Sequence, residues 1–197
     1  TLGLPNELAI NACGPAYGPN CNENLEWNTT TPVNGPGGPL DGYEISYQQP
    51  FTFLPGFLKN FGFTGSYTHV DAKMDYVNAK GEILSTASLI NLSPSTSSAT
   101  IYYEQDAFKA RVSVAKRAGY LTVATNDANL NYQNGTNATT NVDAQVSYQI
   151  NDNFKVTLDM LNLTNEIDDQ WVDEADQRLS YVHETGRQFN LGVNYKF

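Results

Sequence analysis

The hydrophobic residues of this chain recur at every second position in seven separate runs, a spacing that predicts β-strands. The clearest run ends the sequence, where Phe189, Leu191, Val193, Tyr195 and Phe197 alternate with polar residues or glycine. The seven runs cover residues 43–51, 61–68, 99–104, 108–115, 142–150, 154–160 and 188–197. Each run places apolar side chains on one face of its strand and mostly polar side chains on the other.

The segments between the runs alternate between short turns and long connections. We expect short turns at residues 54–56, 104–107 and 151–153, and long loops at about 71–96, 121–140 and 165–180. An up-and-down antiparallel meander places all of its short turns at one end and all of its long loops at the other. This asymmetry is typical of outer-membrane barrels, which have short periplasmic turns and longer extracellular loops.

The aromatic residues favour the membrane barrel over a soluble fold. Seven of them lie beside the short-turn end of the runs: Phe51, Phe53, Phe57, Tyr103, Phe108, Phe154 and Phe197. A transmembrane barrel needs such a belt of rings at the height of the lipid headgroups. A soluble sandwich would instead distribute its aromatic residues through its core, and a secreted β-sandwich binding module is the soluble alternative.

Composition and charge narrow the function further. Charged residues make up 16% of the chain, below the roughly 25% of globular domains. The formal net charge is −10, which argues against a nucleic-acid partner because phosphates require a basic surface. No residue pattern indicates a cofactor.

Residues 1–42 lack periodicity and are rich in Pro, Gly and Asn, which predicts an extracellular loop before the strands of 43–197. Cys13 and Cys21 enclose a short Pro- and Gly-containing stretch. A disulfide between them would imply an oxidising compartment, and two free thiols are the alternative.

Four segments resemble TonB-dependent outer-membrane receptors in order and spacing. They are residues 42–73, residues 99–121, residues 156–166 with their Asn-Leu-Thr-Asn stretch, and residues 183–197 with Gly-Arg-x-Phe and a terminal Phe. The resemblance implies an all-β, antiparallel up-and-down transmembrane barrel of about 22 strands. It also implies an N-terminal plug inside the barrel and a TonB-type protein that pulls on the plug to admit ligand.

On this resemblance the chain supplies about seven C-terminal strands of the barrel. The remaining strands and the plug would belong to another chain or to a missing segment. Phe197 resembles the terminal signal that barrel-assembly machinery reads, and an ordinary girdle aromatic is the alternative.

Two sets of residues are candidates for contact with ligand or plug. Trp27, Tyr132 and Trp171 fall in predicted extracellular loops, where their rings could stack on a ligand. The charged residues Arg111, Asp143, Lys155 and Asp159 fall on the polar face of their strands. They would point into the lumen and either pair with the plug or simply solvate the wall.

The acidic run at residues 168–176 is a further candidate. Asp168, Asp169 and Asp173 could bind Ca²⁺ through their carboxylates, and a solvated acidic loop is the alternative. Divalent cations bridging to lipopolysaccharide would relieve the repulsion among these groups. The protein would then contact lipopolysaccharide as well as membrane lipid.

The sequence contains no catalytic constellation. His69 and His183 are far apart in the sequence, and neither belongs to a recognisable nucleophile motif. We therefore predict a non-enzymatic outer-membrane receptor for TonB-energised uptake of a scarce nutrient. A passive porin or an adhesive barrel without a plug is the alternative.

The ligand class is set only weakly by the sequence. The acidic composition disfavours anionic ferric siderophores, because like charges repel at the entrance. Aromatic loop residues suit sugar rings and aromatic siderophores alike. A neutral oligosaccharide is slightly favoured over a siderophore-like ligand, with peptides and metal complexes as further alternatives.

Overall fold

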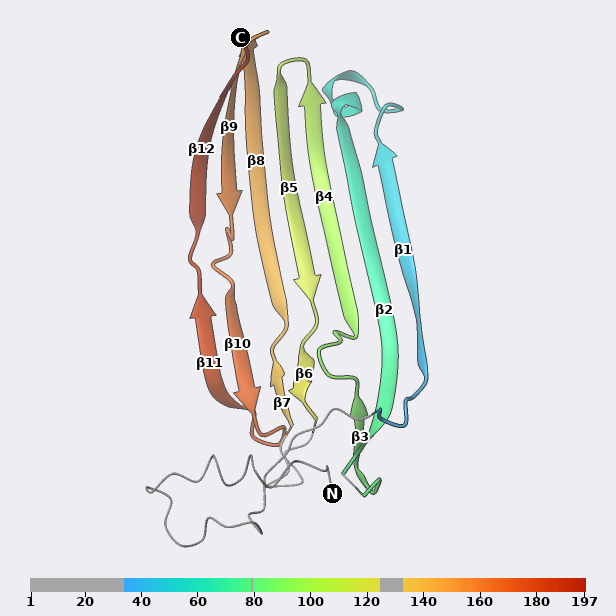
Figure 1. Ribbon diagram of the computed structural model, residues 1–197. Coiled ribbons are helices and arrows are strands. Elements are labelled where there is room, and N and C mark those ends of the chain that lie inside the picture. The colour runs from blue at the N-terminus through green and yellow to red at the C-terminus, as the bar shows by residue number, and fades with distance from the viewer. Residues whose placement is uncertain (1–33, 79, 125–132) are drawn as a thin grey trace, which may run out of the picture. The chain divides into compact units, whose positions relative to one another are not determined.

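The computed structural model describes residues 34–78, 80–124 and 133–197, and a single antiparallel sheet dominates them (Figure 1). Seven strands follow one another in the order β1-β2-β4-β5-β8-β9-β12. Their bounds are β1 (Leu40–Pro50), β2 (Phe61–Val77), β4 (Ser95–Gln105), β5 (Phe108–Arg117), β8 (Thr139–Asn151), β9 (Phe154–Leu161) and β12 (Gln188–Tyr195). These strands correspond to the seven alternating runs, so the predicted up-and-down meander is confirmed.

One face of the sheet is apolar and exposed. Residues directly opposite one another on neighbouring strands share a face, and one such row joins Ala110, Val146, Leu158 and Leu191. Ile101 and Val112, on the central strands β4 and β5, are 54% and 49% exposed. No large side chain among the described residues is fully buried. A sandwich would cover such a face with a second sheet, so the soluble sandwich is not supported.

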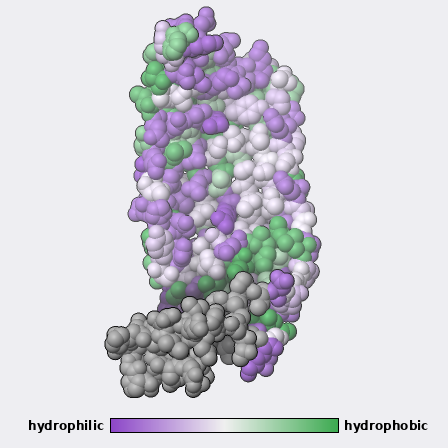
Figure 2. Space-filling model, in the orientation of Figure 1, coloured by the Kyte–Doolittle hydropathy of each residue, from purple (hydrophilic) through white to green (hydrophobic). Residues whose placement is uncertain are grey.

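The opposite face is polar. Ser66 and Ser98 are hydrogen-bonded across β2 and β4 at 2.8 Å, and Thr100 and Ser113 are hydrogen-bonded across β4 and β5 at 2.8 Å. Figure 2 shows one face of the molecule, on which hydrophilic and neutral residues cover most of the strands. Exposed apolar side chains on one face and hydrogen-bonded hydroxyls on the other suit a wall between lipid and a wet interior.

The short turns gather at one end of the sheet (Figure 1). The turns that join β4 to β5 and β8 to β9 have two residues between the strands. The first connection is longer than expected and contains the 3₁₀ helix η2 (Gly56–Asn60). None of the helices among the described residues has the length and hydrophobicity to cross a membrane.

Aromatic rings form contacts along this end of the sheet, as the girdle prediction requires. Phe61 lies edge-on to Tyr103 with centroids 4.8 Å apart, and Tyr103 lies 6.0 Å from Phe108. Further along, Tyr195 lies 6.2 Å from Phe154 and 6.4 Å from Phe197. Phe61, Tyr103, Phe108 and Phe154 adjoin the connections at this edge, and Tyr195 lies at the same height because it pairs in register with Phe154.

The long connections are not irregular loops, which corrects the sequence-based expectation. They contain five further strands: β3 (Ile83–Ser88), β6 (Tyr120–Val123), β7 (Asn134–Thr136), β10 (Ile167–Val172) and β11 (Arg178–Glu184). β3 pairs with the long strand β2, and the other four form a separate sheet in the order β11-β10-β7-β6. The wall therefore continues well beyond the seven main strands.

A break interrupts four of the wall strands at a similar height (Figure 1). It separates β5 from β6 at residues 118–119, β7 from β8 at 137–138, β9 from β10 at 162–166 and β11 from β12 at 185–187. The membrane-side ladder and the outer four-stranded ladder are distinct sheets across this strand break. The strand break is the place where the polar face becomes hollow.

Candidate ligand-binding site

Charged side chains gather on the polar face of the membrane-side strands. Arg111 of β5 and Asp159 of β9 both lie opposite Gln145 of β8. The Gln145 side-chain amide donates a hydrogen bond to the Asp159 carboxylate. Arg111, Asp159 and Asp143 line one shallow hollow, so three of the four predicted lumen residues lie together.

The fourth residue, Lys155, shares the face of Asp159 but lies nearer the short turns. It pairs in register with Gln149 and Asn194. The hollow contains the acidic residues Asp143 and Asp159 and the basic residue Arg111, and Lys155 lies apart from it. The wall therefore carries charges of both signs. Such charges can pair with groups of a plug, which the described residues do not include.

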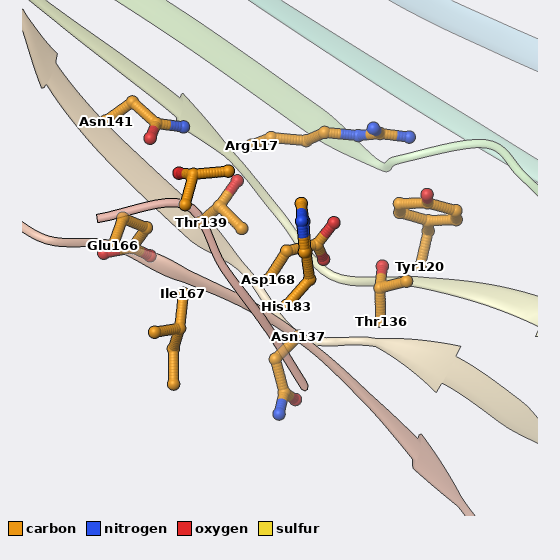
Figure 3. Close-up of a pocket in the computed structure, with 11 residues that line it drawn as sticks. Arg117, Tyr120, Thr136, Asn137, Thr139, Asn141, Glu166, Ile167, Asp168 and His183 are labelled. Carbon is orange, nitrogen blue, oxygen red and sulfur yellow. The ribbon is translucent and has the colours of Figure 1, made fainter. Parts of the chain in front are cut away.

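A second hollow, of about 250 Å³, lies at the strand break (Figure 3). Arg117 and Thr139 lie opposite each other at the ends of β5 and β8, on its membrane side. Asp168 of β10 lies opposite His183 of β11 on its outer side. The guanidinium of Arg117 lies 4.0 Å from the ring centroid of Tyr120, a cation–π contact that fixes both groups.

A larger hollow, of about 740 Å³, adjoins it and shares Tyr120, Thr136 and Asn137 in its lining. The Oγ1 atom of Thr136 is buried and has no hydrogen-bond partner among the described residues. A buried hydroxyl without a partner is unusual in native structures. Thr136 lies where the linings of the two hollows meet.

The turn after β9 is held by the side chain of Asn162, which is buried and has a positive φ of 53°. Its Oδ1 atom accepts a hydrogen bond from the backbone N–H of Glu166 at 2.6 Å. Its amide donates to the backbone oxygens of Glu166 at 3.1 Å and Gly186 at 3.2 Å. The Asn-Leu-Thr-Asn stretch thus ties the two breaks of β9–β10 and β11–β12 together.

This turn also places Glu166 at the edge of the hollow. One Glu166 carboxylate oxygen accepts a hydrogen bond from the backbone N–H of Thr140 at 2.8 Å. The backbone N–H of Asn162 in turn donates to the Asp143 carboxylate at 2.9 Å. The sequence alone placed Asn162 only in the Asn-Leu-Thr-Asn stretch of the resemblance, because the hydrogen bonds at Thr140, Asp143 and Gly186 join residues distant in the sequence.

Of the three aromatic residues predicted to contact ligand, only Trp171 lies in the described part of the chain. Trp171 lies in β10 rather than in an irregular loop, is 8% exposed, and lines the larger hollow. Its ring lies against Gly135, where an added Cβ would meet the ring atom Cζ2 at 2.5 Å. Trp27 and Tyr132, like Cys13 and Cys21, fall outside the described residues.

The structure does not bring the three predicted calcium carboxylates together. Asp169 accepts a hydrogen bond from the Asn137 side-chain amide at 2.7 Å, whereas Asp173 pairs with Arg178 at 3.1 Å. Asp168 and Asp169 are adjacent in a strand and therefore project to opposite faces. Within the described ranges, no three acidic, histidine or cysteine side chains form a group suited to a metal ion.

The two histidines belong to different surfaces. His69 of β2 lies with its ring centroid 5.5 Å from that of Tyr43 on the apolar face. His183 lies in the hollow at the strand break. They do not form a joint site.

Sequence reasoning missed Arg117, Tyr120, Thr136 and Asn141 as site residues. Arg117 continues the polar face six residues after Arg111, so the alternation could have placed it. The hollow itself could not be foreseen, because it depends on breaks that occur at the same height in four strands.

Comparison with known proteins gives one match. The family model described as "TonB dependent receptor-like, beta-barrel" matches residues 6–163, which is most of the chain. The match begins before β1 and ends in the turn after β9. No curated protein and no solved structure matches the chain.

Proposed function

The chain belongs to the TonB-dependent receptor β-barrel family, and on that premise we propose that it forms part of the wall of a receptor for active nutrient uptake. The receptor resides in a bacterial outer membrane. A plug domain inside the barrel and a TonB-type energising protein are the partners of this proposal. The family is one of receptors and transporters, and we assign no catalytic activity to the chain.

One observation supports this function above the others: the described sheet has an exposed apolar face and a polar, hollowed face. Leu191 is 73% exposed and Val193 60% exposed on the apolar face. Contact with lipid acyl chains is favourable for such an apolar face, whereas contact with water is not. The charged side chains on the polar face then line a lumen.

For the ligand, we propose a neutral oligosaccharide in preference to an anionic siderophore-like chelate. The formal net charge of −10 repels anions. The carboxylates of Asp143 and Asp159 outnumber Arg111 in the wall hollow, which adds to that repulsion. Lipopolysaccharide and membrane lipid are further partners of this proposal.

Growth and uptake measurements on a deletion strain test the proposal. The strain is grown on single neutral oligosaccharides and, separately, under iron limitation with ferric siderophores. We expect loss of growth on one oligosaccharide at low concentration, and loss of its uptake when the membrane is de-energised or the TonB-type protein is removed.

Other outcomes would identify a different function. Uptake that persists in de-energised cells would indicate a passive porin. A strain with normal uptake of all ligands but reduced surface attachment would indicate an adhesive barrel. Loss of growth only with ferric siderophores would retain active transport and replace the ligand class.

A further inference from the structure

We propose that the hollow at the strand break is a subsite for a neutral, polyhydroxylated part of the transported ligand, such as a sugar ring. The inference rests on the proposed function and deepens it, because it assigns a ligand class to named wall residues. Arg117, Asn141, Asp168 and Thr136 are the hydrogen-bonding groups, and Tyr181 supplies an aromatic face.

The strand break creates the space. Where β5, β8, β9 and β12 end, the membrane-side ladder stops and the outer ladder begins. The side chains at the edges of the two ladders then surround a volume of about 250 Å³ instead of packing on one another. Whole ligand sites occupy roughly 300–1,000 Å³, so this hollow fits one part of a ligand. The adjoining hollow extends it.

The lining combines donors with acceptors. Arg117 offers only donors, Asp168 offers only acceptors, and the amide of Asn141 offers both. Figure 3 shows Asp168 beside His183 in the middle of the hollow, with Arg117 above Tyr120. A sugar hydroxyl both donates and accepts a hydrogen bond, so adjacent hydroxyls are satisfied by such a mixed set. A purely anionic ligand would leave the acceptors unpaired.

The buried hydroxyl of Thr136 gives independent support. Thr136 is 6% exposed, it lines both hollows, and its Oγ1 atom has no partner in the described part of the chain. A buried hydroxyl without a hydrogen-bond partner destabilises the folded state. A ligand hydroxyl between the two hollows would supply the missing hydrogen bond.

An aromatic residue, Tyr181, lies on the same face of β11 two residues before the lining residue His183. Tyr120, Thr136, Gln170 and Tyr181 lie opposite one another in register across β6, β7, β10 and β11. Strands lie about 4.8 Å apart, so this row spans about 14 Å. Tyr181 is 52% exposed, whereas one face of Tyr120 is covered by Arg117. One ring of an oligosaccharide can therefore stack on Tyr181 while the hydroxyls of a neighbouring ring reach Thr136.

The charged groups of the hollow disfavour an anionic siderophore-like chelate. Glu166 and Asp168 outnumber Arg117 as charged groups in the lining. The guanidinium is also engaged over the Tyr120 ring. An anionic chelate would have to displace this contact and approach two carboxylates. A neutral ligand need not displace the contact between Arg117 and Tyr120, and the carboxylates do not repel it.

The test uses the complete receptor, purified with its plug in detergent, and a panel of neutral oligosaccharides and anionic ferric siderophores. Binding is measured by calorimetry for the wild type and for the variants Asp168→Asn, Tyr181→Ala and Thr136→Val. We expect an oligosaccharide to bind the wild type. Asp168→Asn and Tyr181→Ala should each weaken its Kd by about tenfold, the effect of one lost charge-assisted hydrogen bond or one lost stacking contact.

Matched variants on the opposite face of β11 are the controls. Glu184→Gln adjoins His183 on β11 and removes one negative charge as Asp168→Asn does, and Val182→Ala adjoins Tyr181 on β11. Both should bind the oligosaccharide with the affinity of the wild type. Heat-modifiable migration in gels verifies that every variant is folded, and a misfolded Thr136→Val protein leaves the two other substitutions to decide.

The outcomes separate this inference from the proposed function. If the wild type binds an oligosaccharide and Asp168→Asn and Tyr181→Ala bind it equally well, the subsite is refuted while receptor function stands. Unchanged binding with reduced energised uptake would make the hollow a plug contact, which also refutes it. Binding of ferric siderophores alone overturns the sugar assignment. Uptake without energisation would instead overturn the proposed function.

Discussion

At the scale of single residues, the most heavily bonded side chain of the candidate site belongs to Asn162. Its φ of 53° lies in the left-handed region, which Asn tolerates better than most residues. Its side-chain oxygen and amide together bind Glu166 and Gly186. One residue thus fixes both the turn after β9 and the entry to β12.

We predict that Asn162→Ala lowers the free energy of unfolding by roughly 3 kcal/mol, the sum of left-handed strain and lost buried hydrogen bonds. Urea unfolding of the receptor in lipid vesicles measures this change. Asn165→Ala is the control, because Asn165 has a similar φ of 55° and its side chain donates one bond, to Glu184. Equal effects of the two substitutions would contradict the role of the Asn162 side chain.

A second residue-scale prediction concerns Gly62 on the polar face. An added Cβ would meet the ring of Tyr102 at 2.2 Å, so the ring occupies the space above the glycine. Gly62→Ala should destabilise the wall by about 1–3 kcal/mol through this overlap. In the Tyr102→Ala background the same change should cost much less, and a double-mutant cycle measures the coupling. Additive effects would show that the ring does not rest on Gly62.

At the scale of elements, the alternation of side chains predicted the seven main strands because lipid and lumen impose opposite demands on their two faces. Ile101 and Val112 carry that signal in β4 and β5. The five outer strands were missed because their alternation is weak: in β7, for example, the three residues Asn134–Thr136 contain no apolar side chain. The candidate hollow could not be predicted, since it depends on interruptions that only the strand register aligns.

The apolar and polar faces of β12 lead to a prediction at the scale of elements. Leu191→Arg places a charge on the apolar face and should cost about 2–4 kcal/mol if the residue lies near the bilayer midplane. Asn190→Arg, one residue earlier on the polar face, should have little effect. Folding yield and urea unfolding in vesicles compare the two variants. A larger cost for Asn190→Arg would reverse the assignment of the faces.

At the scale of the whole molecule, the sheet is open and strongly acidic. β1 and β12 are its edge strands and do not pair with each other. Unpaired backbone groups are not tolerated in hydrocarbon, so we expect both edges to pair with further strands of the receptor. The formal net charge of the chain is −10.

This charge predicts how salt affects ligand capture. Association of a neutral oligosaccharide should change by less than about twofold between low and physiological ionic strength, because there is no charge to screen. Association of an anionic ferric siderophore should accelerate with salt, since screening reduces the repulsion. Stopped-flow fluorescence on the purified receptor distinguishes the two. An oligosaccharide whose association slows steeply with salt would contradict a neutral capture step.

The strand break has a consequence for how this protein tolerates change. Because the outer ladder is hydrogen-bonded separately from the membrane-side ladder, a residue inserted into the β10–β11 hairpin need not shift the register of β9 and β12. The turns at residues 162–166 and 185–187, which the side chain of Asn162 holds together, separate the outer hairpin from the membrane-side strands. We therefore expect the outer hairpin to tolerate insertions and substitutions that would disrupt the membrane-side strands.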